Sequence, residues 1–260
     1  MIFLCFFLIK RLLYLQVNKT FTVVVENINE APINISLTSE YGQRSFPDNI
    51  PKVNENSKRG TTVGTFHALD HDEVQSLNFS LNDDASGKFT VGARVFCHNN
   101  TYIPGVKTKC TTLLKVSGDL NYETSSSEDI LVRVTDDSGL FRVQPFKVTI
   151  LDVNDRPKNI TLTGEDTAFI DENVNDGFVG ELATIDEDIN QTHSYTLINN
   201  GGWKFILRQN KIFSSFYANL DYETKSEYSI AVRSSDNGSP RLSIDKTFTV
   251  QVSGSVLVMI

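Results

Sequence analysis

Lys246-Thr-Phe-Thr-Val-Gln-Val252 carries an apolar side chain at every second position, and the same pattern occurs twice earlier, as Gln144-Pro-Phe-Lys-Val-Thr-Ile150 and Lys19-Thr-Phe-Thr-Val-Val-Val25. A side-chain period of two is typical of a β-strand that buries one face. Because the pattern returns at long intervals, the chain is predicted to consist of repeated units, each ending in such a strand.

Further landmarks recur in one order between these strands. A proline, Pro32 or Pro157, follows the first two copies and precedes another alternating stretch. Four motif pairs come next: Val-Asn-Glu55-Asn with Asp-Glu172-Asn, Ala-Leu-Asp70-His-Asp72 with Thr-Ile-Asp186-Glu-Asp188, Leu120-Asn-Tyr-Glu-Thr124 with Leu220-Asp-Tyr-Glu-Thr224, and Val132-Arg-Val-Thr-Asp136 with Val232-Arg-Ser-Ser-Asp236. The order predicts two complete repeats.

The landmarks divide the chain of 260 residues into five parts. Two domains agree with that length, because single domains typically hold about 100–150 residues. We predict an apolar, signal-like or artefactual segment at 1–16, the last strand and linker of a preceding repeat at 17–30, repeat 1 at 31–155, repeat 2 at 156–254 and a truncated end at 255–260.

The repeats are predicted to be all-β. Short strands alternate with turns rich in Gly, Asn, Asp and Ser, and no stretch keeps the period of 3.6 that a helix requires. Strands at this spacing favour two tandem Greek-key β-sandwiches of immunoglobulin-like type.

Composition excludes several classes of function. The net charge is −8 and there is no basic stripe, which argues against a nucleic-acid partner. Only four histidines are present and no serine lies in a nucleophile elbow, so we predict neither enzymatic activity nor a small-molecule substrate. Seven Asn-x-Ser/Thr sequons favour an extracellular chain: Asn18, Asn34, Asn78, Asn99, Asn159, Asn190 and Asn237.

Two of the three cysteines, Cys97 and Cys110, flank a polar insertion in repeat 1. A local disulfide is the simplest interpretation in an extracellular chain, with Cys5 unrelated to it. The alternative is a metal site formed by Cys97, His98 and Cys110, which lacks a fourth ligand at a plausible spacing.

Acidic residues gather where the two repeats are predicted to meet. Stacking two sandwiches end to end brings the lower loops of one against the upper loops of the next. Such a cluster of carboxylates would repel itself without cations, and an oxygen-only ligand set suits Ca²⁺, which takes 6–8 oxygens. The residues at this inter-repeat site are Glu55, Glu123, Asp152, Asn154, Asp155, Asp186, Asp188 and Asp236.

Together these motifs resemble the cadherin repeat over residues 19–252. The family pattern has an early Glu, Asp-x-Asp, Leu-Asp-x-Glu, a late Asp and an Asp-x-Asn-Asp-Asn-x-Pro connector. The resemblance implies up to three Ca²⁺ at the junction, with an added oxygen from Asn190, which also heads a sequon. Two departures lower that number: the family's Leu-Asp-x-Glu aspartate is Asn121, and the connector Asp152-Val-Asn-Asp-Arg-Pro157 is one residue short.

Two further acidic sets would form incomplete sites. Asp70, Asp72 and Asp136 form an upper set whose preceding repeat is not in this chain. Glu172, Asp221 and Glu223 form a lower set that lacks a following connector.

The resemblance also implies a function. We expect Ca²⁺ to turn a hinged linker into a stiff one in a calcium-dependent cell-adhesion protein, with homophilic binding to a cadherin-type ectodomain on an adjacent cell. That places the chain on the extracellular side of the plasma membrane, with the membrane anchor outside this chain. The alternative is a cadherin-like calcium-binding spacer in a matrix or surface protein that binds carbohydrate or matrix.

Overall fold

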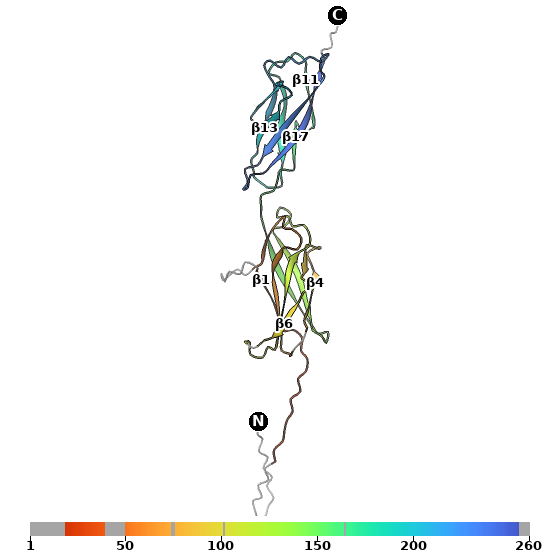
Figure 1. Ribbon diagram of the computed structural model, residues 1–260, viewed down its shortest axis with the longest axis vertical. Coiled ribbons are helices and arrows are strands. Elements are labelled where there is room, and N and C mark those ends of the chain that lie inside the picture. The colour runs from red at the N-terminus through yellow and green to blue at the C-terminus, as the bar shows by residue number, and fades with distance from the viewer. Residues whose placement is uncertain (1–18, 40–49, 74–75, 101, 164, 255–260) are drawn as a thin grey trace, which may run out of the picture.

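The computed structural model describes residues 19–39, 50–73, 76–100, 102–163 and 165–254. The predicted segments 1–16 and 255–260 therefore lie outside the described residues. The described residues form seventeen strands and no helix, so they contain no helix that could span a membrane. The strands form two elongated bodies that follow one another along the long axis of the molecule (Figure 1).

The first body is a sandwich of two sheets. One sheet has the order β1-β3-β7-β5, with β6 also paired to β7, and the other has the order β2-β9-β8-β4. The strands of this body are β1 (Asn34–Ser39), β2 (Lys52–Asn54), β3 (Thr62–Asp70), β4 (Asn78–Asp83), β5 (Phe89–Val91), β6 (Phe96–Asn99), β7 (Thr108–Val116), β8 (Ser127–Thr135) and β9 (Phe141–Leu151).

The second body repeats this arrangement with sheets β10-β12-β15-β14 and β11-β17-β16-β13. Its strands are β10 (Asn159–Leu162), β11 (Thr167–Asp171), β12 (Phe178–Ile185), β13 (Ser194–Asn199), β14 (Phe205–Arg208), β15 (Lys211–Ser214), β16 (Glu227–Ser235) and β17 (Ser243–Ser253). The prediction of an all-β chain built from two sandwiches is confirmed.

The last strand of each sandwich lies inside its sheet rather than at an edge. It pairs antiparallel with the strand before it along the chain and parallel with a short early strand, β2 in the first body and β11 in the second. The parallel registers align Val53 with Ile150 and Ile170 with Val252. β2 and β11 thus lie in the sheet opposite the strand before them, β1 and β10 respectively.

The apolar side chains of the alternating strands β9 and β17 point into the cores of the sandwiches. Phe248, Val250 and Val252 on β17 are at most 3% exposed, and Val148 and Ile150 on β9 are equally buried. Each sandwich encloses its own hydrophobic cluster. The two cores are therefore separate, and the hydrogen bonds that join the repeats in the described part of the chain lie in loops and the linker.

Residues 19–25 share the sequence pattern of β9 and β17 but pair with no strand among the described residues. Phe21, Val23 and Val25 are 71%, 82% and 87% exposed. An isolated strand has no partner for its backbone and no second sheet for its apolar face, so the pattern alone does not create a strand here. That this segment is the last strand of a preceding repeat stays a prediction.

The insertion in repeat 1 contains β6, which pairs with β7. Cys97 and Cys110 are directly opposite one another in this pairing and form a disulfide. The predicted disulfide is confirmed, and the alternative metal site is wrong because both sulfur atoms are already in the bond.

Candidate metal centre

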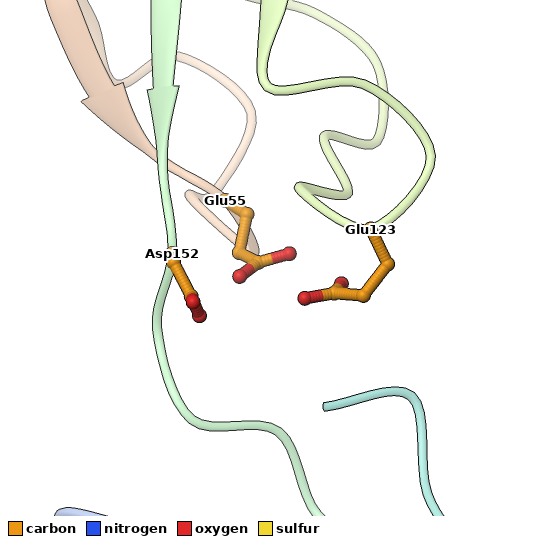
Figure 2. Close-up of side chains that lie close together, drawn as sticks. All are labelled: Glu55, Glu123 and Asp152. Atoms are coloured by element: carbon orange, nitrogen blue, oxygen red, sulfur yellow. The ribbon is translucent and has the colours of Figure 1, made fainter. Parts of the chain in front are cut away.

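Carboxylates from both repeats meet around the linker that joins β9 to β10. Two groups of three have ligand oxygens within 4.8 Å of one another: Glu55, Glu123 and Asp152, and Glu123, Asp155 and Asp188. Glu123 belongs to both groups. Figure 2 shows the first group, with the three side chains pointing into one space from three separate segments.

Glu55 is held by the backbone on both sides. It follows β2, is 2% exposed, and accepts hydrogen bonds from the N–H of Tyr122 at 2.7 Å and from the N–H of Val153 at 2.9 Å. One carboxylate therefore connects the first loop, the Leu-Asn-Tyr-Glu turn and the start of the linker. This connection places Glu123 and Asp152 beside it.

Asp155 joins the linker to both repeats. Its backbone N–H donates to Oδ2 of Asp188 at 2.8 Å, and its Oδ1 accepts from the Nδ2 amide of Asn56 at 2.7 Å. The second group of carboxylates thus contains one residue from repeat 1, one from the linker and one from repeat 2.

Asp236 and Asp186 lie next to this centre, outside both groups of three. Asp236 is fully buried, and its Oδ1 accepts the backbone N–H groups of Gly238 and Leu242, each at 3.0 Å. The Nδ2 amide of Asn154 reaches its Oδ2 at 3.3 Å. Asp186 lies 2.8 Å from Nε2 of His193.

Gln191 is the site residue that sequence reasoning missed. Its Nε2 lies 2.6 Å from both Oδ2 of Asp188 and Oδ1 of Asn154, and its buried Oε1 has no hydrogen-bond partner in the described part of the chain. Its neighbour Asn190, which the resemblance implies as an added oxygen ligand, is exposed and has a φ of 69°, and its role as a ligand stays a prediction. The family motifs contain no residue at the position of Gln191, so the sequence alone offered no reason to select it.

Electrostatics at the junction favour a bound cation. Burial raises the pKa of Glu123, and the nearby carboxylates of Glu55, Asp188 and Asp155 raise it further. Burial and neighbouring carboxylates likewise raise the pKa values of Asp155 and Asp188. Each shift means that negative charge is costly in this position, and a cation would offset that cost.

The donor set fits Ca²⁺. Oε2 of Glu123 is buried and has no hydrogen-bond partner among the described residues, so it is available to a cation. Side chains from both repeats and the linker line an open cleft here, and the ligand atoms offered are oxygens. Oxygen ligands in flexible segments suit Ca²⁺, whereas Zn²⁺ would call for His or Cys.

The upper acidic set lies at the opposite end of repeat 1. Asp70, Asp72 and Asp136 are at most 6% exposed. The Nδ2 amide of Asn27 donates to Asp72 at 2.6 Å, and that of Asn29 donates to Asp136 at 2.8 Å. The first connector thus contacts the upper loops of repeat 1 as the second connector contacts those of repeat 2.

The lower acidic set repeats the geometry of Glu55 and its neighbours. Glu172, Asp221 and Glu223 have ligand oxygens within 4.8 Å of one another. Glu172 accepts the N–H of Tyr222 at 3.2 Å, as Glu55 accepts that of Tyr122. The prediction placed these three side chains together correctly, and whether they bind metal stays a prediction.

A family model and several known proteins match the sequence of this chain. The family model described as Cadherin domain matches residues 166–253. Human protocadherin gamma-A3 is 33% identical over 216 residues, which cover 79% of this chain and 21% of the relative. The chain belongs to the cadherin family. Because cadherin domains are non-enzymatic modules, the prediction that the chain is not an enzyme is confirmed.

Solved structures agree on the cadherin fold. Protocadherin gammaB7 extracellular domains 3–6, solved as a cis dimer, match 87% of this chain and 51% of that chain, with a TM-score of 0.54 and 19% identity. Protocadherin gamma B2 domains 3–6 match the same shares with a TM-score of 0.51 and 17% identity. The chain spans about a fifth of the length of the curated cadherin relatives it matches.

Proposed function

We propose that the linker between the two cadherin repeats binds Ca²⁺ and that the bound ions fix one repeat relative to the next. The observation that carries the proposal is the position of Glu123, which belongs to both carboxylate groups and has a buried oxygen without a partner in the described residues. The proposed ligands are Glu55, Glu123, Asp152, Asn154, Asp155, Asp186, Asp188 and Asp236, with Asn190 as an additional candidate.

The physical reason for rigidity is that the ligands come from three parts of the chain. Glu55 and Glu123 belong to repeat 1, Asp155 to the linker, and Asp188 to repeat 2. Without a cation these charges repel one another, and two unit charges 4 Å apart near a protein surface interact with about 4 kcal/mol. An ion shared by all three parts converts that repulsion into a restraint on the linker.

Calcium titration calorimetry of the whole chain tests the proposal. Extracellular Ca²⁺ modules bind with a Kd of about 10⁻⁴–10⁻³ M. We expect Asp155→Asn to weaken binding at the junction at least about tenfold, because it removes a charge that faces two other carboxylates.

The matched control is Asp119→Asn, since the Asp119 side chain is 99% exposed and only approaches Arg59 at 3.8 Å. Equal titrations for the two variants would falsify the assignment of the site.

At the level of the parent protein, we propose a calcium-dependent cell-adhesion role on the extracellular side of the plasma membrane. The support is membership of the cadherin family and likeness to a protocadherin. The expected partner is a cadherin-type ectodomain on an adjacent cell, with homophilic contact as the first case to test. Aggregation of beads coated with the chain, with and without Ca²⁺, examines this role; aggregation unaffected by chelator would contradict it.

A further inference from the structure

One contact between the two repeats uses none of the proposed metal ligands. Asn121 lies in the turn before β8 of repeat 1, and Glu187 lies just after β12 of repeat 2. The Nδ2 amide of Asn121 donates to Oε2 of Glu187 at 3.3 Å. The other oxygen of Glu187, Oε1, forms an ion pair with Nζ of Lys158.

The orientation of the Asn121 amide is fixed by its own turn. Its Oδ1 accepts the backbone N–H of Thr124 at 2.6 Å, so its NH₂ group must point the other way, towards Glu187. Repeat 2 has Asp221 at the matching position, and its Oδ1 accepts the N–H of Thr224 in the same manner. An aspartate at position 121 would present a second carboxylate oxygen to Glu187 and would repel it.

Lys158 is also held in place. It is the first residue after the linker proline, and its backbone N–H donates to the carbonyl of Ile185 at 2.8 Å. This bond anchors it beside the end of β12, two residues before Glu187. Asn121 and Lys158 thus contact one oxygen each of Glu187, which is in neither group of three carboxylates at the linker.

We propose that Asn121, Glu187 and Lys158 form a latch between the repeats that needs no bound cation and holds the repeats together when calcium is absent. None of these three residues is among the proposed Ca²⁺ ligands. That set of ligands is the one point at which this inference rests on the proposed function. Where the family pattern has an aspartate, this chain has Asn121. The replacement removes one negative charge and adds a hydrogen-bond donor that connects the two repeats.

Small-angle X-ray scattering of the whole chain in excess EGTA tests the latch. The test variant is Asn121→Leu, which keeps the size of the side chain but removes both the donor to Glu187 and the acceptor of the Thr124 N–H, so a variant at Glu187 accompanies it. We expect the population of extended molecules, relative to bent ones, to fall roughly fivefold, the effect of losing one partly exposed hydrogen bond to a charged group. Asn121→Asp should reduce it further through repulsion. In saturating CaCl₂, Asn121→Leu and the unmodified chain should give superimposable curves.

A second variant and a control keep the test decisive. Glu187→Ala removes the other side of the contact, and combining it with Asn121→Leu should add nothing beyond the larger single effect. Asn78→Leu changes an exposed asparagine at the start of β4 and should leave the chelated curve unaltered. Far-ultraviolet circular dichroism confirms that each variant is folded.

The latch is overturned if the chelated curves of Asn121→Leu and Glu187→Ala both equal that of the unmodified chain. Failure of the proposed function is a different result, in which CaCl₂ produces no binding heat and no change in the scattering of the unmodified chain.

Discussion

His67 on β3 is a half-buried imidazole whose Nε2 lies 3.1 Å from the hydroxyl of Thr38. Its Nδ1 is buried and has no partner in the described part of the chain. Burial lowers the pKa of His67, and the positive charge of Lys109 lowers it further. The folded chain therefore resists protonation at this position more than the unfolded chain does.

This shift predicts how stability depends on pH. Above about pH 6.5 the imidazole is neutral in both states and the shift has no effect. As the pH falls below that value, the unfolded chain binds a proton that the folded chain does not, so the free energy of unfolding decreases until the folded-state pKa is passed. We expect thermal unfolding between about pH 7.5 and 5.5 to shift less in His67→Gln than in the unmodified chain. Parallel shifts would contradict this account.

Glu123→Gln should have opposite effects with and without calcium. In EGTA the substitution removes a charge that burial and three carboxylates make unfavourable, so the melting temperature should rise at neutral pH. In millimolar-range CaCl₂ it removes a ligand, so the calcium-induced rise in melting temperature should shrink. Asp129→Asn, on exposed β8 surface, serves as the control. A fall in melting temperature for Glu123→Gln in EGTA would count against the electrostatic account.

For individual side chains at the linker, the sequence predicted the positions of the carboxylates better than the contacts of the side-chain amides. Glu55, Glu123 and Asp188 could be predicted because repeated motifs mark them and carboxylates in a shared gap imply a common partner. Gln191 and the donor role of Asn121 could not, because motif spacing does not tell which end of an amide faces a neighbour. That direction depends on backbone contacts such as the N–H of Thr124, which only the fold reveals.

At the level of secondary-structure elements, two copies of Lys-Thr-Phe-Thr-Val differ in structure: the copy at 246–250 lies in β17, whereas the copy at 19–23 forms no strand. Phe248 on β17 is 1% exposed, whereas Phe21, at the same position of the first copy, is 71% exposed. Phe248→Ala should lower the free energy of unfolding by about 3–5 kcal/mol, because it leaves a cavity in a closed sandwich. Phe21→Ala should change it by less than about 0.5 kcal/mol.

Urea unfolding of the two variants checks this pair, with the unmodified chain measured alongside. If Phe21→Ala were as destabilising as Phe248→Ala, the segment at residues 19–25 would have to pack on the rest of the chain.

The strands themselves were largely predictable from alternation. The alternating stretch that follows Pro157 coincides with β10 at Asn159–Leu162, and the pattern at 246–252 lies within β17. The segment at 19–25 shows why alternation is insufficient: a strand needs a hydrogen-bonding neighbour and an opposing sheet, and both are matters of tertiary structure. The pairing of β6 with β7 was equally hidden, although the two cysteines correctly indicated that the insertion closes on itself.

For the whole molecule, calcium should change the shape far more than it changes the fold. The two cores are separate, so restraint at the linker acts on the angle between the repeats and leaves the strands unchanged. We expect the radius of gyration to rise from EGTA to saturating CaCl₂, while the far-ultraviolet circular dichroism spectrum stays constant. MgCl₂ at the same concentration should be much less effective, because Mg²⁺ demands a stricter octahedral geometry. An unchanged radius of gyration would contradict the proposed stiffening.

The parallel pairing of β2 with β9 and of β11 with β17 has a mechanical consequence. The chain enters each repeat at one end and leaves from the other, so tension applied along the molecule draws these paired strands past one another lengthwise. Under such shear all the hydrogen bonds of the pair carry load together, instead of parting one after another as in an opening zipper. We therefore expect resistance to pulling to be concentrated in these two short pairs of strands, one in each repeat, once the entry strands β1 and β10 have separated from their neighbours.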